Sequence, residues 1–176
     1  MDRTGAESML DSLVDALAVE GCFYGELTAT LEREGAALVS MPAMAAEELL
    51  RVTSLKEAIV ARIRAQSGVI EQAMTALASA LDMTQGQGRI SLSRLIDHLD
   101  GAPRVRLQAA RHHVVTLSEQ AATLNRANDR LLQRSLTYVT HYLTFLQSLL
   151  SASAGYRPSG DSPERSLSGR IVAVKG

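Results

Sequence analysis

Histidine and cysteine are the residues of this sequence that could ligate a transition metal or supply a nucleophile. The chain has one cysteine, Cys22, and four histidines, His98, His112, His113 and His141. On a helix the adjacent His112 and His113 would point about 100° apart, so they cannot chelate one metal together. No Glu-x-x-His or His-x-x-x-His spacing occurs, which a di-metal site in a helical bundle would need. Cys22 has no basic neighbour in the sequence, and we expect it to be a small packing residue on a helix face.

The sequence also gives no support for acid–base catalysis or for phosphate binding. Carboxylates are numerous in residues 1–40, but they are spread around a predicted helix with no apolar pocket to tune one of them for catalysis. The segment Gln85-Gly86-Gln87-Gly88 lacks the third glycine and the preceding strand of a dinucleotide-binding loop. We therefore predict a protein that is not an enzyme and that has neither a metal site nor a cofactor.

The composition indicates an all-α protein. Apolar residues make up 46% of the 176 residues and aromatic residues only 3%, whereas good helix formers dominate. The N-terminus has no signal-peptide pattern, and no apolar run is long enough to cross a bilayer. A single cysteine fits a reducing compartment. We expect a cytoplasmic protein without membrane insertion.

The hydrophobic periodicity predicts four helices. They cover about residues 7–39, 43–81, 92–99 and 104–153. The first two are similar in length and are separated only by a short break at Pro42, which favours a long antiparallel hairpin. Ser91 can cap the short third helix, and Gly101 can close it. We predict one elongated, coiled-coil-like bundle over residues 1–154 and a flexible tail, rich in Gly, Pro and Ser, over residues 155–176.

The last predicted helix is too long, at roughly 75 Å, to be an ordinary core helix. One stripe of side chains runs along it: Leu107, Ala110, Val114, Leu117, Ala121, Leu124, Asn128, Leu131, Ser135, Tyr138, Tyr142, Phe145 and Leu149. A second stripe occurs only in its C-terminal part: Leu132, Leu136, Val139, Leu143, Leu146 and Leu150. One packed neighbour covers a single stripe. The second stripe therefore needs another helix, from the same chain or a dimer mate, or a partner protein.

Polar and small residues interrupt these apolar faces. Asn128 and Ser135 lie on the first stripe, and we interpret both as register markers, because a buried polar residue tolerates few alignments. Glu34 falls on the apolar stripe of the first helix. Gly21 and Gly25 each weaken that helix by about 1 kcal/mol, and we expect them to permit close helix contact.

Charge is distributed unevenly. Residues 1–40 carry eight acids and two arginines, a balance of −6, and residues 101–154 carry six arginines and two acids, a balance of +4. These helices either face each other or place their charges in solvent. A nucleic-acid interface is disfavoured because no lysine accompanies the arginines and no aromatic residues interleave with them.

Two motifs occur on the second and fourth predicted helices. Thr53 and Lys56 belong to a Thr-x-x-Lys-Glu element followed by paired apolar positions. Asn125, Asn128 and Leu131 belong to a Leu-Asn-x-x-Asn-x-x-Leu-Leu pattern.

A third motif follows the long helix, where Tyr156 and Gly160 bracket Arg157-Pro158-Ser159. Together the three motifs resemble those of the FlgN-type flagellar export chaperones, in the same order and over nearly the whole chain. The third departs from the family's Tyr-Gly-x-x-Gly because Arg157 replaces the usual glycine.

The resemblance implies a chaperone that binds the C-terminal helical segments of hook-associated proteins, prevents their premature assembly and brings them to the cytoplasmic domain of the export gate. It also implies that Tyr156, with Gly160, docks on that gate. The doubled apolar face independently suits an amphipathic helix as its partner. We predict these client-binding residues: Leu132, Leu136, Tyr138, Val139, Tyr142, Leu143, Leu146 and Leu150.

Two other classes stay open at this point. A coiled-coil scaffolding protein would bury the second apolar stripe permanently in a stable oligomer, and a homodimer would do so with one mate. A metal-binding or nucleic-acid-binding helical bundle is disfavoured by the missing ligand spacing and the mixed charge.

Overall fold

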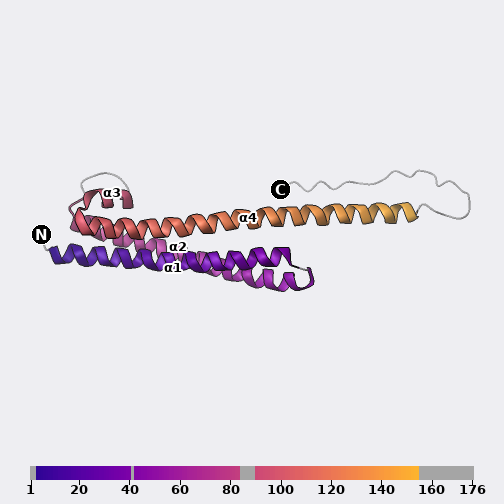
Figure 1. Ribbon diagram of the computed structural model, residues 1–176, viewed down its shortest axis with the longest axis horizontal. Helices are drawn as coiled ribbons and strands as arrows, with labels where there is room; N and C mark the ends of the chain where they lie inside the picture. The colour runs from indigo at the N-terminus through magenta and orange to yellow at the C-terminus, as the bar shows by residue number, and fades with distance from the viewer. Residues whose placement is uncertain (1–2, 41, 84–89, 155–176) are drawn as a thin grey trace, which may run out of the picture. The chain divides into compact units, whose positions relative to one another are not determined.

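Four α-helices make up the part of the chain that the computed structural model describes, which is residues 3–40, 42–83 and 90–154. They are α1 (Arg3–Val39), α2 (Pro42–Ala80), α3 (Leu92–His98) and α4 (Gly101–Ala154) (Figure 1). No strand occurs among these residues, so the predicted all-α class is confirmed. Pro42 is the first residue of α2, where its missing N–H deprives the helix of no hydrogen bond.

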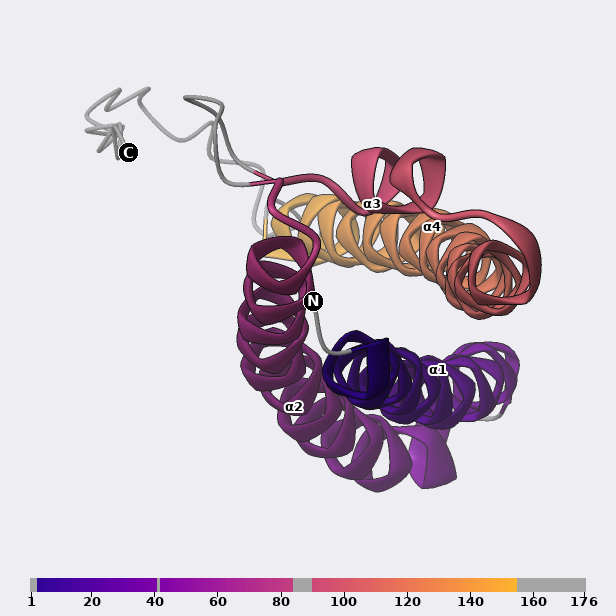
Figure 2. The same ribbon diagram turned by 90° about the vertical axis from the view of Figure 1, so that its left-hand side faces the viewer.

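The first two helices form an antiparallel hairpin, as the sequence predicted. Figure 1 shows α1 and α2 running side by side in opposite directions, and Figure 2 shows the same pair seen along the helices. Ion pairs cross between them: Arg33 Nη2 lies 2.6 Å from Glu48 Oε1, and Arg62 Nη1 lies 2.6 Å from Glu26 Oε2. The Arg62 guanidinium also lies 4.1 Å from the centre of the Phe23 ring.

The short helix α3 starts as the sequence predicted. The Ser91 hydroxyl accepts a hydrogen bond from the Arg94 backbone N–H at 3.3 Å, which caps the helix. Gly101, with φ of +61°, begins α4 in a backbone conformation that side chains disfavour.

Two clusters of buried side chains hold the helices together. The larger joins α1, α2, α3 and α4 through Leu10, Leu13, Ile70, Leu77, Leu95, Ile96 and Leu107. The smaller joins α1, α2 and α4 through Leu27, Leu31, Ile59 and Ala121. The acidic α1 and the basic α4 are also linked, because Arg106 Nη2 lies 2.5 Å from Asp11 Oδ1. The two helices with opposite charge balances therefore do contact each other.

The described part of the chain divides into two compact units, the first ending at Arg134 and the second beginning at Ser135. The predicted bundle over residues 1–154 spans both, and the predicted tail, residues 155–176, lies outside the described residues. The first stripe of α4 is buried or half-buried from Leu107 to Leu131, but Ser135 is exposed. The prediction that Ser135 is a buried register marker is therefore wrong, and only Asn128 has a buried side chain of that kind.

The two glycines of α1 that were predicted to permit close contact differ. A Cβ on Gly21 would lie 3.2 Å from His113 Cδ2, so α4 does approach α1 closely there. A Cβ on Gly25 would meet no atom within 4 Å, so the prediction for Gly25 is wrong. A third glycine, Gly35, makes a closer approach, because its Cβ would lie 2.8 Å from Asn128 Oδ1.

Alanine substitutions at Gly25 and Gly35 are expected to have opposite effects on stability. Gly25→Ala should raise the free energy of unfolding by about 1 kcal/mol, because alanine is the better helix former and the added methyl group meets open space. Gly35→Ala should lower it, because the methyl group displaces the Asn128 side chain. Urea denaturation followed by circular dichroism measures both. Equal effects of the two substitutions would contradict the packing described for Gly35.

Candidate functional site

A polar cluster joins α1, α2 and α4 inside the first unit. Lys56 Nζ donates a hydrogen bond to Glu34 Oε1 at 2.6 Å. Asn128 Nδ2 donates to Glu34 Oε2 at 2.9 Å and to the Leu31 carbonyl oxygen at 2.7 Å. Glu34 is 9% exposed and Asn128 is 6% exposed. Because Glu34 and Asn128 are withdrawn from water, they depend on partners within the cluster for their hydrogen bonds.

Sequence reasoning identified Lys56 and Asn128 by their motifs but did not identify what they bind. Their common partner is Glu34, and Gly35 provides the space for Asn128 Oδ1. The available signal was an acid on the apolar stripe of the first helix, followed directly by a glycine. The cluster brings the motif of α2 and the motif of α4 to one place.

A hollow of about 340 Å³ lies beside this cluster. It is lined by Glu34, Leu38, Leu49, Thr53, Lys56, Asn125, Asn128, Asp129 and Leu132. The motif residues Thr53 and Asn125 are exposed at it, whereas the motif residue Leu131 is half-buried and does not line it. Leu132, predicted to bind a client, is 43% exposed and belongs to this hollow in the first unit.

The second unit carries most of the predicted client-binding residues, and all of these except Leu146 are exposed. We define the C-terminal apolar face as Leu136, Tyr138, Val139, Tyr142, Leu143, Phe145, Leu146, Leu149 and Leu150. Leu146 is half-buried, and the exposed fractions of the others range from 49% at Leu149 to 73% at Tyr138. Phe145 and Leu149 were predicted as stripe members but not as binding residues, although they are about as exposed as Tyr142 and Leu143.

The side of α4 opposite to this face carries hydroxyl groups that bond to the helix itself. Thr140 and Thr144 donate to the carbonyl oxygens of Leu136 and Thr140, each at 2.9 Å. Ser148 donates to the Phe145 carbonyl oxygen at 2.7 Å. This segment of α4 is therefore strongly amphipathic, with one apolar half and one hydroxyl-rich half.

The family model of the FlgN protein matches residues 9–164 of the chain. The chain belongs to the FlgN family. It is therefore a flagellar export chaperone, and the FlgN family is a family of chaperones rather than enzymes. Searches of the curated proteins and of the solved structures found no match. The resemblance that the three motifs predicted is confirmed.

The FlgN match includes the third motif, but Tyr156 and Gly160 lie outside the described residues. Within residues 3–40, 42–83 and 90–154, no helix is long and apolar enough to cross a membrane. In the same ranges, no group of three or more His, Cys, Asp or Glu side chains is placed to hold a metal ion.

The residues that first suggested chemistry are scattered over the FlgN-family chaperone. His98, His112, His113 and His141 are all exposed. His113 packs beside Gly21 of α1. Cys22 is exposed as well, so the prediction that it packs on a helix face is wrong.

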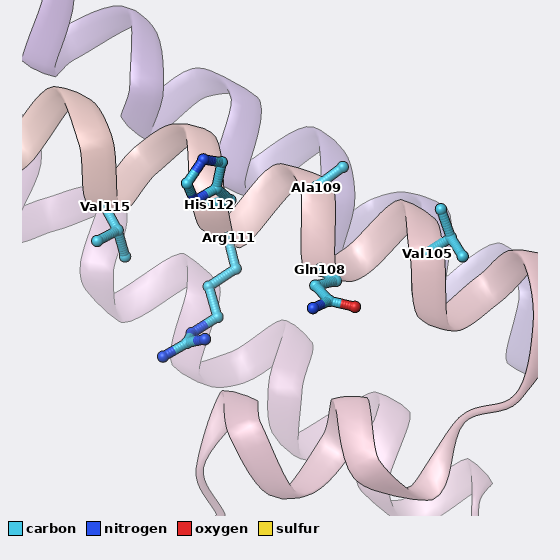
Figure 3. A pocket seen from close by; sticks show the side chains of 6 residues that line it. All are labelled: Val105, Gln108, Ala109, Arg111, His112 and Val115. Carbon is cyan, nitrogen blue, oxygen red and sulfur yellow. The ribbon is translucent and has the colours of Figure 1, made fainter.

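A second hollow, of about 420 Å³, lies along the N-terminal half of α4 (Figure 3). Its lining comes from that helix alone: Val105, Gln108, Ala109, Arg111, His112 and Val115. Figure 3 shows Gln108 and Arg111 extending to one side of the helix and Ala109 to the other. Because all six lining residues come from one helix, the hollow is an open groove on its surface, and we assign it no binding role.

Two side chains of α1, Glu20 and Tyr24, have raised pKa values. Burial raises the pKa of the Glu20 carboxyl, and a hydrogen bond from the Ser67 hydroxyl opposes this shift. Burial, followed by the negative charge of Glu20, raises the pKa of the Tyr24 phenol. Since packing is the main cause of both shifts, we assign the pair no chemical role.

Proposed function

We propose that this chaperone binds the C-terminal helical segments of hook-associated proteins through the C-terminal apolar face. It thereby prevents these proteins from assembling prematurely and delivers them to the cytoplasmic domain of the export gate. Its place of action is the cytoplasm.

The observation that carries the proposal is the exposure of an apolar half-helix within residues 135–151. Large apolar side chains on one half of an amphipathic helix are the surface into which a partner helix packs. Each leucine that a client buries fully would contribute about 1.5–3 kcal/mol. Leu132, which lines the hollow of the first unit, is a further proposed contact.

Copurification with light scattering tests this proposal against the scaffolding alternative. The chaperone is expressed with a hook-associated protein from the same genome, and the complex is separated by size exclusion. A 1:1 complex that replaces the client-free species supports the chaperone. A stable homo-oligomer that does not change when the client is added would favour a scaffold in which copies of the chain cover the face.

Docking on the export gate is proposed for Tyr156 with Gly160, on the basis of the family motif. A phenol offers rigid apolar area and one hydrogen bond at a low ordering cost. Tyr156→Ala should leave client binding unchanged and should weaken binding to the purified cytoplasmic domain of the gate about tenfold. Titration calorimetry with each partner measures both effects. Unchanged affinity for the gate would remove Tyr156 from the docking site.

A further inference from the structure

One segment of α4 has an unusual distribution of charge. Residues 135–154 contain no Asp, Glu, Lys or Arg. The preceding part of the same helix packs on α1 and α2 and carries exposed charged side chains on its other surfaces: Arg104, Arg106, Arg111, Glu119, Arg126, Asp129, Arg130 and Arg134. The outward half of an amphipathic surface helix carries charged or polar side chains, and in residues 135–154 this half is polar but has no Asp, Glu, Lys or Arg.

The two halves of this segment differ sharply. Successive residues of a helix are turned by about 100°, which places the whole C-terminal apolar face on one half. The other half carries uncharged polar side chains: Thr137, Thr140, His141, Thr144, Gln147, Ser148 and Ser151. The hydroxyl groups of Thr140, Thr144, Ser148 and Ser151 donate to carbonyl oxygens of α4 itself. These four hydroxyl groups therefore have a hydrogen-bond acceptor within the helix, which lowers the cost of moving them from water to lipid headgroups.

We propose that the C-terminal apolar face also holds the client-free chaperone on the surface of a bilayer with uncharged, loosely packed lipids. Amphipathic helices that sense lipid packing lie in the plane of the interface with their apolar half among the acyl chains. Such a helix with few charges has little attraction for anionic headgroups, so bulky apolar side chains that fill packing defects dominate its binding. The helix lies on the bilayer and does not span it.

The aromatic side chains fit this position. Tyr138 and Tyr142 are 73% and 53% exposed, and each combines an apolar ring with a polar hydroxyl. Tyrosines of this kind are enriched where hydrocarbon meets water. Tyr138 lies near the border between the two halves, where its hydroxyl can reach the headgroups.

This inference goes beyond the proposed function but uses the same face. A client helix and a bilayer therefore exclude each other. The client-free chaperone would stay bound to the membrane surface. It would dissociate from the bilayer when a client covers the face.

Vesicle flotation with the full-length, client-free chaperone tests the inference. The probes are pure phosphatidylcholine vesicles of about 30 nm and about 200 nm diameter, and anionic phosphatidylglycerol vesicles of the larger size. Binding to the small neutral vesicles is expected to be at least about tenfold stronger than to the large neutral ones, because high curvature opens packing defects. It should change little when salt rises from about 0.1 M to about 0.5 M.

Two double variants locate the binding. Leu136→Asp with Leu143→Asp should reduce binding to the small neutral vesicles at least about tenfold, because both charges enter the apolar half. Thr137→Asp with Thr144→Asp has the same spacing and charge on the polar half, and should bind within about threefold of the unaltered chaperone. Circular dichroism in solution checks that both variants stay helical.

Several results would overturn the inference. They are no binding to small neutral vesicles, equal binding to small and large ones, or salt-sensitive binding to anionic vesicles only. A self-associated chaperone that covers this face and ignores vesicles would overturn it too. Copurification with a client is measured without lipid, so failure of the vesicle experiment and failure of the proposed function are separate results.

Discussion

Copurification with the hook-associated client is expected to be lost when Leu136 and Leu143 are both replaced by aspartate. Each is 54% exposed in the chaperone, and a docked client helix would bury both. Losing two buried leucine contacts of about 1.5–3 kcal/mol each lowers the affinity at least about 100-fold. The two carboxylates would also be desolvated in the complex, which weakens binding further.

The double variant Thr137→Asp with Thr144→Asp is the matched control. Its two positions are one residue further along α4, with the same spacing and the same added charge, but on the polar half of the helix. Client affinity should stay within about threefold of the original value. If the Leu136/Leu143 variant still copurifies with as much client as the original protein, this face is not the binding site.

Circular dichroism separates loss of binding from loss of structure in the same variants. Because Leu136 and Leu143 are exposed, aspartate at these positions should leave the helical signal near that of the original protein. A large loss of helix would mean that the face is covered within the protein's own assembly. The scaffolding alternative would then account better for the exposed stripe.

The second large effect is expected for Asn128→Asp, which changes one amide to a carboxylate. Asn128 Nδ2 donates to Glu34 Oε2 at 2.9 Å, and both side chains are buried. The substitution places a second negative charge against Glu34 and removes the donor to the Leu31 carbonyl oxygen. Lys56 offsets only part of this repulsion. We expect the free energy of unfolding to fall by about 3 kcal/mol.

Urea denaturation of Asn125→Asp provides the comparison for this prediction. Asn125 lines the same hollow three residues earlier on α4, but it is exposed. Its substitution should change the free energy of unfolding by less than about 0.5 kcal/mol. Similar losses for both variants would mean that added charge on α4, rather than the contact with Glu34, causes the effect.

The contact between the two motifs could not be predicted from the sequence. Thr53 and Lys56 were recognised as one motif and Asn125 and Asn128 as another, about 70 residues apart. Only the packing of α1, α2 and α4 shows that Lys56 and Asn128 share Glu34 as their partner. A motif specifies residue types at short spacing, whereas a contact between helices depends on their relative register.

The same reason accounts for the corrections. Gly21, Gly25 and Gly35 are alike in sequence, but only Gly21 and Gly35 have a side chain of α4 directly against them. Asn128 and Ser135 lie on one stripe of α4, yet Asn128 is buried and Ser135 is exposed. Helical periodicity shows which side chains share a face, but not whether another helix lies opposite that face.

The sequence by itself determined the helices, their approximate ends, the doubled apolar stripe of α4 and the FlgN family. These depend on local properties: the 3.6-residue period, the capping residues and short motifs. The tertiary structure decided which parts of each stripe are buried and that Glu34 joins Lys56 to Asn128. Burial and pairing require atoms from distant parts of the chain, so they follow from packing rather than from any single segment.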